Sequence, residues 1–415
     1  TLITIIFILV GPKYSKIQKL TDDLNQVTRE TLTGIRVVRA HHAESVQQDK
    51  FEDVNKTITK TNIFVNTAMS FIGPGMNIIM YSMNLGLVLV GALLIRDNLL
   101  GSNAYEGISL QAQFTQYSMV ILMSFMMLIM LFIFLPRAWV SARRVSAVLN
   151  TKPKIDDKLA NDVKPSNNVE IEFINVCFKY PNAEECVLKD LNFKVKMGET
   201  LAFIGSTGSG KSTIVQLILR FYEVTEGQIL INKKDIKNYK LSDLYQMMGY
   251  VPQQGILFSG DVMSNAILGN PNATEKEVME AIDTAQFKDY IDESEEGLHR
   301  TIDQGGNNVS GGQKQRLAIT RALVKKPVIY LFDDSFSALD YRTDKLLRNA
   351  LKKVTDNALK IIIGQRIGTI MDAQQIIVLD KGAIVGKGTH KELLQTCKPY
   401  QDIAFAQLSK EELTH

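Results

Sequence analysis

The sequence predicts a membrane region built of α-helices, followed by a soluble α/β domain. Residues 61–95 and 117–135 contain no charged side chain, and each tract is about as long as the ~20 residues that a helix needs to cross hydrocarbon. Beyond residue 150, short apolar strands, turns and charged helices alternate, which is typical of α/β domains. Since single cores stop growing at roughly 250 to 300 residues, a chain of 415 residues is expected to hold two or more units.

The boundaries follow from this change in composition. We place the membrane region at residues 1–150, a linker at 151–168 and the soluble domain at 169–415. The first apolar tract, TLITIIFILV, would cover only ~15 Å as a helix, about half of a bilayer, so the chain is expected to begin inside a span. Residues 13–60 are too polar for the membrane, and their apolar residues recur at helical spacing. They predict a long helical excursion with its tip at residues 41–51.

The basic residues predict the orientation. They follow the first and last apolar tracts, whereas the loop at residues 96–107 is short and nearly neutral. Because cytoplasmic loops carry the excess of Lys and Arg, both basic flanks are expected in the cytosol. This makes the protein a multi-pass protein of the cell membrane with its soluble domain in the cytoplasm. The residues used are Lys13, Lys16, Lys19, Arg29, Arg36, Arg39, Arg137, Arg143 and Arg144.

Composition excludes several other classes. The net charge is +3, and no basic tail or aromatic-interleaved patch favours binding to nucleic acid. The three cysteines, Cys177, Cys186 and Cys397, have no metal-type spacing and suit a reducing cytosol. The five histidines are equally dispersed, so no zinc site is predicted.

The stretch GSTGSGKST is the most specific local pattern, because it matches G-x-x-x-x-G-K-[ST]. It follows the apolar strand TLAFIG and precedes a helical segment, which is the context that this motif needs. In such a loop, backbone N–H groups surround phosphate, Lys211 reaches the β- and γ-phosphates, and Ser212 offers a hydroxyl to Mg²⁺. The predicted phosphate-binding residues are Gly205, Ser206, Thr207, Gly208, Ser209, Gly210, Lys211, Ser212 and Thr213.

Two further stretches fit the same chemistry. LFDDSFSALD begins at the end of an apolar strand, and Asp333 there is a candidate ligand of Mg²⁺. VSGGQ opens an amphipathic helix whose free N–H groups suit a second anion. One chain cannot easily place both helix ends on one nucleotide. We therefore expect two such domains to meet head to tail, each lending its SGGQ, here Ser310, Gly311, Gly312 and Gln313, to the nucleotide of the other.

The order of these motifs resembles the nucleotide-binding domain of an ABC transporter. The resemblance covers residues 169 to about 410 and rests on Tyr180, GSTGSGKST, Gln253 in YVPQQ, VSGGQ, LFDD, SALD and the region after IIIG. The preceding helices resemble the last three helices of an exporter with long intracellular loops. The resemblance implies an α-helical transmembrane domain followed by an α/β P-loop NTPase domain with the helical subdomain of ABC proteins. It also implies ATP and Mg²⁺ as cofactors.

The resemblance assigns roles by position. Tyr180 resembles the aromatic residue that stacks on adenine, with a packing tyrosine at a strand end as the alternative. Gln253 resembles the glutamine that contacts Mg²⁺ and senses the membrane domain, with an ordinary loop amide as the alternative. Asp340 lies in the segment that crosses between paired domains, and a helix N-cap is its competing interpretation. The implied Mg²⁺ ligands are thus Ser212, Gln253 and Asp333.

The sequence departs from the family pattern at two catalytic positions. The family usually has a glutamate after the Mg²⁺ aspartate and a histidine in the later switch, whereas this chain has Asp334 and Gln365. Losing one methylene retracts the carboxylate by ~1.5 Å, and a misplacement of about 1 Å can cost ~10²-fold in rate. Gln365 can hydrogen-bond but cannot hold a proton or a charge. We expect a site that binds ATP and hydrolyses it poorly, completed by a heterodimeric partner.

The predicted function is ATP-driven export of amphipathic or hydrophobic compounds, as one half of a bacterial heterodimeric multidrug exporter. The alternatives are export of a lipid or peptide, or a regulatory subunit that does not transport. A soluble ATPase of the same fold is disfavoured by the charge-free spans. Polarizable methionines crowd the last span and suit an adaptable apolar pocket, although packing against lipid explains each of them equally well. Asn77 and Asn84 share a helix face and are candidates for the transport path or for helix packing.

Overall fold

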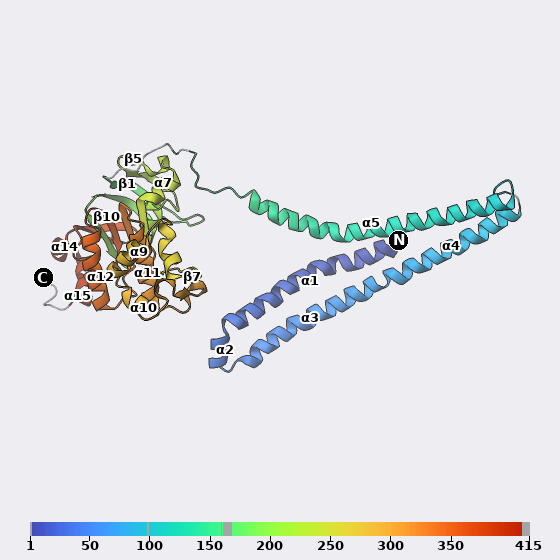
Figure 1. The fold of residues 1–415 in the computed structure, drawn as a ribbon, viewed down its shortest axis with the longest axis horizontal. Helices are drawn as coiled ribbons and strands as arrows, with labels where there is room; N and C mark the ends of the chain where they lie inside the picture. The colour runs from blue at the N-terminus through green and yellow to red at the C-terminus, as the bar shows by residue number, and fades with distance from the viewer. Residues whose placement is uncertain (1, 98, 159, 161–167, 409–415) are drawn as a thin grey trace. The chain divides into compact units, whose positions relative to one another are not determined.

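The structure is a computed structural model that describes residues 2–97, 99–158, 160 and 168–408. The chain divides into two compact units, Thr1–Thr151 and Lys152–His415 (Figure 1). Residues 159 and 161–167 of the predicted linker lie outside the described residues.

The described residues of the first unit form helices joined by short turns. Its helices are α1 (Leu2–Thr33), α2 (Ile35–Ala40), α3 (Glu44–Ser70), α4 (Ile72–Arg96) and α5 (Ala104–Leu149). Helix α1 lies beside α3, and their shared core is formed by the buried Val10 and Val65 (Figure 1). Helix α2 and the turn at residues 41–43 join α1 to α3, and residues 44–51 of the predicted tip form the start of α3. The predicted helical excursion therefore agrees with α1 to α3.

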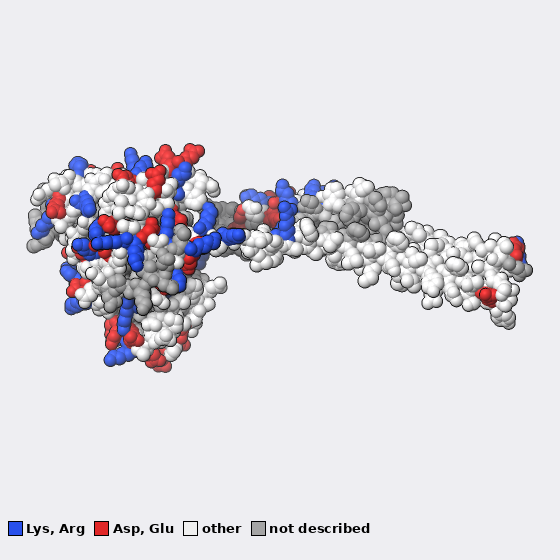
Figure 2. All heavy atoms as spheres, turned by 90° about the horizontal axis from the view of Figure 1, so that it is seen from above, with Lys and Arg blue, Asp and Glu red and all other residues white. Residues whose placement is uncertain are grey.

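The apolar character of this unit agrees with a membrane region. Within the described residues, one helical run, Glu44–Arg96, is long and apolar enough to cross a membrane. In Figure 2, charged side chains are sparse along much of this unit and dense over the other one. The predicted span at residues 117–135 lies within the continuous helix α5. The side chains of residues 2–7, 129, 132 and 133 are not described, so the first and last predicted spans stay predictions.

Helices α4 and α5 approach each other closely at Gly91. The Nε2 of Gln111 donates a hydrogen bond of 2.7 Å to the carbonyl oxygen of Leu87. A Cβ at the buried Gly91 would lie 1.4 Å from Gln111 Oε1. The Gln111 amide therefore occupies the space that a side chain at residue 91 would fill. The bond satisfies a side-chain amide in an apolar setting, where an unpaired polar group is costly.

The second unit is built on two sheets. The larger sheet has the order β12-β11-β3-β10-β9-β6, in which β12 pairs antiparallel with β11 and the other pairs are parallel. Its strands are β3 (Thr200–Gly205), β6 (Met248–Val251), β9 (Ile329–Asp333), β10 (Leu359–Ile363), β11 (Gln375–Asp380) and β12 (Ala383–Gly388). The smaller sheet is antiparallel, with the order β2-β1-β4-β5. Its strands are β1 (Glu170–Phe178), β2 (Leu188–Lys196), β4 (Glu226–Ile231) and β5 (Lys234–Asp235).

Three apolar cores are buried in the part of this unit that the structure describes. One lies between the sheets, where Phe193 stacks on Phe173 at 4.2 Å and meets Phe203 edge-on at 5.3 Å between ring centroids. The second fills a mainly helical part that includes the short pair β7 (Gly260–Asp261) and β8 (Thr301–Ile302). The third includes residues of β3, β11, α13, α14 and α15. The helices of the unit are α6 (Lys211–Ile218), α7 (Leu241–Met247), α8 (Val262–Ala266), α9 (Glu275–Thr284), α10 (Lys288–Asp292), α11 (Gly311–Val324), α12 (Tyr341–Val354), α13 (Ile367–Ile370), α14 (His390–Thr396) and α15 (Lys398–Gln407).

Candidate functional site

The carboxyl ends of three neighbouring parallel strands form the candidate site. The glycine-rich loop follows β3, the two aspartates end and follow β9, and Gln365 lies shortly after β10. These strands are adjacent in the order β3-β10-β9, so their carboxyl ends lie side by side. Ligands of open α/β sheets bind at this edge.

The glycine-rich loop is a close turn of backbone around a buried lysine. The N-cap of α6, Gly210, has φ +94°, and a Cβ there would lie 2.5 Å from Leu188 Cδ2. The Nζ of Lys211 donates to the carbonyl oxygens of Gly205 at 2.9 Å and Ser206 at 2.7 Å. Burial lowers the pKa of Lys211, and the charges of Asp334 and Asp333 oppose that shift. A buried cation beside exposed N–H groups at a helix start is suited to phosphate.

Asp333 and Ser212 meet as the motif predicts for two ligands of one cation. The hydroxyl of Ser212 donates to Asp333 Oδ1 over 2.7 Å. Burial raises the pKa of Asp333, while the hydrogen bond from Ser212 and the charge of Lys211 lower it. A hydroxyl and a carboxylate are oxygen ligands of the kind that Mg²⁺ prefers.

Asp334 is held in an unusual backbone conformation and by two amides. Its φ is +48°, in the left-handed region, and its N–H donates to the carbonyl oxygen of Ile363 at 2.9 Å. Its Oδ2 accepts from Gln365 Nε2 at 2.7 Å and from Gln253 Nε2 at 3.3 Å. Burial and the neighbouring charge of Asp333 raise the pKa of Asp334. The two glutamines and the short carboxylate thus form one hydrogen-bonded cluster.

A cavity of 340 Å³ collects most of the predicted residues. Val187 and Ile363 also line it, and the predicted residues at its surface are Tyr180, Thr207, Gly208, Gly210, Lys211, Ser212, Thr213, Gln253, Asp334 and Gln365. Gly205, Ser206 and Ser209 belong to the same loop and Asp333 to β9, and these four residues do not line the cavity. Residues 310–313 and Asp340 do not line this cavity.

Tyr180 takes part in the site through its hydroxyl group. The hydroxyl lies 3.0 Å from Thr213 Oγ1 and donates to Gln216 Oε1 at 2.9 Å, which ties it to α6. Its ring meets Phe178 and Tyr222 edge-on, with centroid distances of 4.9 and 5.1 Å. This packing agrees with the alternative interpretation of Tyr180, and the stacking role stays a prediction.

The SGGQ stretch and Asp340 both begin helices. Ser310 forms a capping box with Gln313, in which Gln313 N–H donates to Ser310 Oγ at 3.3 Å and Ser310 N–H donates to Gln313 Oε1 at 2.9 Å. Asp340 caps α12 by accepting from Thr343 N–H at 3.0 Å, so its competing interpretation as an N-cap agrees with the structure. The exposed Ser310 and Asp340 leave the predicted contacts with a second domain untested.

Sequence reasoning missed two residues that support this site. The guanidinium of Arg366 donates to the carbonyl oxygens of Ser337 at 3.1 Å and Leu339 at 3.3 Å, both in the loop after Asp334. Gln407 of α15 hydrogen-bonds to the backbone around Gln365. Arg366 and Gln407 both bond to backbone groups. Every residue carries such groups, so the sequence of the contacted segment does not reveal these contacts.

The residues present fit ATP and Mg²⁺. The lysine amine, the N–H groups at the start of α6 and the Ser212–Asp333 pair supply donors for phosphate and oxygen ligands for a divalent cation. Such a donor set at the carboxyl edge of a parallel sheet defines an ATP-binding domain of the P-loop class.

Comparison with known proteins identifies the family. The model of the ABC transporter domain matches residues 188–337, and the model of the ABC transporter transmembrane region matches residues 2–134. The chain belongs to the ABC transporter family, as an exporter-type half-transporter in which a transmembrane region precedes an ATPase domain. This family couples ATP hydrolysis to transport.

Particular relatives cover most of the chain. An uncharacterized ABC transporter ATP-binding protein of Mycobacterium tuberculosis is 38% identical over 401 residues, which are 95% of this chain and 67% of that protein. Multidrug resistance protein 4 of Entamoeba histolytica is 39% identical over 276 residues, 64% of this chain and 21% of that protein. Among solved structures, this chain is similar to that of a bacterial Atm1-family ABC exporter with ATP bound. The two superpose with a TM-score of 0.83 at 25% sequence identity, over 99% of this chain and 72% of the exporter chain.

Proposed function

We propose that this chain is one half of a heterodimeric exporter whose own ATP site binds nucleotide and hydrolyses it slowly. Its partner would be a second ABC half-transporter that carries the glutamate and the histidine which this chain lacks. The SGGQ stretch of this chain would complete the partner's active site. The assembly would lie in a bacterial cell membrane as a multi-pass protein, with the ATP-binding domains in the cytoplasm.

One observation supports the slow site more than any other: Asp334 Oδ2 accepts hydrogen bonds from both Gln365 and Gln253. A general base must present a free carboxylate oxygen to water within hydrogen-bond reach. Here the carboxylate is one methylene shorter than the family's glutamate, and the two amides on Oδ2 fix its orientation, so that only Oδ1 is left for water. Gln365 cannot take up a proton. The pair of Asp334 and Gln365 therefore lacks the positive charge that a histidine at residue 365 could carry.

The other residues would bind the nucleotide without needing that base. Lys211 and the N–H groups at the start of α6 would hold the phosphates, and Ser212, Asp333 and Gln253 would hold Mg²⁺, which neutralises phosphate charge when bound. Tyr180 would contact the adenine. This arrangement retains affinity for ATP while losing alignment of water, which suits a site that keeps two domains together.

The intact SGGQ stretch supports the heterodimer. Ser310 to Gln313 start α11 with an ordered capping box and lie outside the cavity of their own chain. Such a helix start can receive the phosphate of another nucleotide. Asp340, at the start of α12, would lie in the segment between the two domains. A homodimer would contain two weakened sites, whereas a heterodimer pairs this chain's intact SGGQ with a complete site on the partner.

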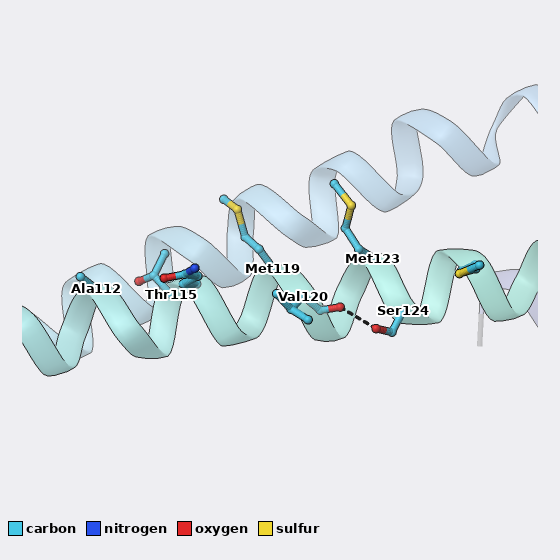
Figure 3. Close-up of a pocket in the computed structure, with 8 residues that line it drawn as sticks. Ala112, Thr115, Met119, Val120, Met123 and Ser124 are labelled. Atoms are coloured by element: carbon cyan, nitrogen blue, oxygen red, sulfur yellow. Dashed lines mark hydrogen bonds between the residues drawn. The ribbon is translucent and has the colours of Figure 1, made fainter.

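A methionine-lined hollow on α5 supports an apolar substrate. It has a volume of 850 Å³ and is open along one face of the helix (Figure 3). Its lining residues are Ala112, Thr115, Gln116, Met119, Val120, Met123, Ser124 and Met127. Flexible thioethers adapt to different shapes, and the few polar groups can orient a ligand. Amphipathic or hydrophobic compounds are therefore the proposed substrates, and the multidrug name of one relative agrees with this class.

The test is to purify the chain alone and together with candidate partner subunits, and to measure assembly and ATP hydrolysis. We expect a stable, active complex only with a partner. A stable homodimer that hydrolyses ATP as fast as other exporters would refute the proposal. Transport of a lipid or peptide is the competing function. A complex that hydrolyses ATP without stimulation by any of these substrates would favour a regulatory subunit instead.

A further inference from the structure

The last residue of α15 makes two hydrogen bonds to the backbone on either side of Arg366. Gln407 Oε1 accepts from the N–H of Ile367 at 2.8 Å, and Gln407 Nε2 donates to the carbonyl oxygen of Gln365 at 2.8 Å. Arg366 has extended backbone angles, φ −103° and ψ 129°, so these two groups point to the same side of the chain. The amide of Gln407 therefore pairs with the segment as a neighbouring strand would.

This pairing takes the place of an ordinary helix cap. Arg366 is the N-cap residue of α13, and its side chain forms no cap hydrogen bond. The N–H of Ile367 belongs to the first turn, where N–H groups lack a partner within the helix. Because Ile367 is fully buried, water is a poor substitute for that partner. Gln407 supplies the missing acceptor from another helix.

The position of Gln407 is fixed by the buried face of α15. Tyr400 and Ala404 are fully buried in the same apolar cluster as Ile367 and Ile370. Residues 400, 404 and 407 lie on one side of the helix, because residues three, four and seven apart share a face. The hydroxyl of Tyr400 lies 2.6 Å from Nδ1 of the buried His390, which anchors α15 to α14. Gln407 itself is exposed, and it ends a helix that this buried face packs onto the apolar cluster.

The segment that Gln407 holds carries a residue of the nucleotide site. The side chain of Gln365 donates to Asp334 Oδ2, and Arg366 donates to the loop that follows Asp334. We propose that Gln407 is a positioning residue, which keeps Gln365 within reach of Asp334 and of the terminal phosphate of bound ATP. This inference rests on the proposed role of Gln365 in the ATP site.

The test compares two amide removals in the same helix. Gln407→Ala removes both bonds to residues 365–367, here called the switch segment. Gln401→Ala is the matched control, because Gln401 Nε2 also makes a 2.8 Å bond to a carbonyl oxygen, that of Leu394 in α14, and does not touch the switch segment. The full chain in lipid nanodiscs is titrated with fluorescent ADP and with a fluorescent ATP analogue that is not hydrolysed. Hydrogen exchange of the peptide containing Ile367 is measured in parallel.

We expect Gln407→Ala to lower the preference for the ATP analogue over ADP by about 3- to 10-fold, since one to two hydrogen bonds cease to hold Gln365. Exchange at Ile367 should accelerate by about 10-fold. Gln401→Ala should change neither quantity, because the buried face of α15 and both bonds of Gln407 remain. Gln407→Glu should keep the protection of Ile367, because a carboxylate still accepts, and should lose the nucleotide preference, because it cannot donate to Gln365.

Gln365→Ala distinguishes the possible failures. If it lowers the ATP preference while Gln407→Ala does not, the role of Gln407 is wrong and the role of Gln365 stands. If Gln365→Ala itself leaves the preference unchanged, both roles are wrong. The double variant should bind like Gln365→Ala alone, because the two residues act through one contact. Additive losses would mean that Gln407 acts on the whole fold and would overturn the inference.

Discussion

The Nε2 of Gln365 donates to Oδ2 of Asp334 over 2.7 Å, which joins the two positions that depart from the family pattern. The amide and the shortened carboxylate complement each other, because one donates where the other accepts. Restoring either residue alone would change one side of this contact without completing the catalytic pair. The two departures are therefore best treated as one unit.

The first prediction follows from that contact. Asp334→Glu with Gln365→His should raise hydrolysis at this chain's site by about 10-fold or more, whereas each single change should alter it only a few-fold. Hydrolysis is measured in the complex with Ser310→Arg present in the same chain, so that the partner's site contributes little. Equal rates for the double variant and the parent would show that these residues do not limit the site.

The second prediction concerns Ser310. Ser310→Arg should reduce hydrolysis by the complex on the order of 10²-fold, because a bulky cation would displace the terminal phosphate of the partner's nucleotide. Ser310→Ala removes the N-cap of α11 without adding a charge. It therefore measures the loss of the cap alone, which should cost about 1 kcal/mol of stability. Ser310→Thr keeps the cap and should remain active. A complex with Ser310→Arg that turns over ATP normally would place SGGQ outside the active site.

The third prediction concerns the tip of the first unit. We predict that the tip at residues 41–51 couples ATP use to transport and that Phe51, 37% exposed near the start of α3, anchors it. Phe51→Ala should lower uptake of a fluorescent hydrophobic dye into inverted vesicles several-fold, with little change in ATP binding. Phe64→Ala is the control, because Phe64 lies exposed on the same helix and outside the tip. Unchanged uptake with Phe51→Ala would remove this residue from the coupling.

The fourth prediction is a pH dependence in the mainly helical part. Nδ1 of His299 lies 3.0 Å from Asp261 Oδ2, and this hydrogen bond raises the pKa of His299. Because the folded pKa exceeds the unfolded one, the pair stabilises fully below the unfolded pKa, and this stabilisation is lost as pH rises through the folded pKa. Asp261→Asn should return the pKa of His299 toward ~6.5 in an NMR titration, since the neutral amide removes the charge.

Asp261→Asn changes the charge and leaves the helix cap in place. Asparagine can still accept from Ser264 N–H, as Asp261 does at 2.7 Å, and so can cap α8. Glu275→Gln removes a more remote charge and should lower the same pKa less. A titration of His299 that is identical in Asp261→Asn and the parent protein would contradict the ion pair.

The fifth prediction tests the close approach of α4 and α5. Gly91→Ala should push the Gln111 amide away from Leu87 and cost about 1 kcal/mol of thermal stability in detergent, since the flexible amide can move at the price of its hydrogen bond. In a Gln111→Ala background the same change should cost almost nothing. Equal losses in both backgrounds would mean that the glycine serves another contact.

The sequence predicted the contacts that depend on residue type. The P-loop pattern and the family resemblance together implied that Ser212 and Asp333 serve one site, and the structure brings their oxygens to 2.7 Å. The sequence also identified Asp334 as a short carboxylate. It could not predict that two amides converge on one oxygen of Asp334, because that depends on how two loops meet. Nor could it find Gln407, since its partners are backbone groups that every residue carries.

The left-handed backbone of Asp334 has a consequence for engineering. Aspartate and asparagine tolerate φ near +48° better than longer side chains, because their short polar groups can bond to nearby backbone. A glutamate at this position would extend the carboxylate toward water and would also place a less favoured residue in that conformation. Selection for a faster enzyme and selection for a more heat-resistant one would therefore act in opposite directions at residue 334. Under the proposed function, in which this chain holds nucleotide and consumes it slowly, the shorter acid can be retained.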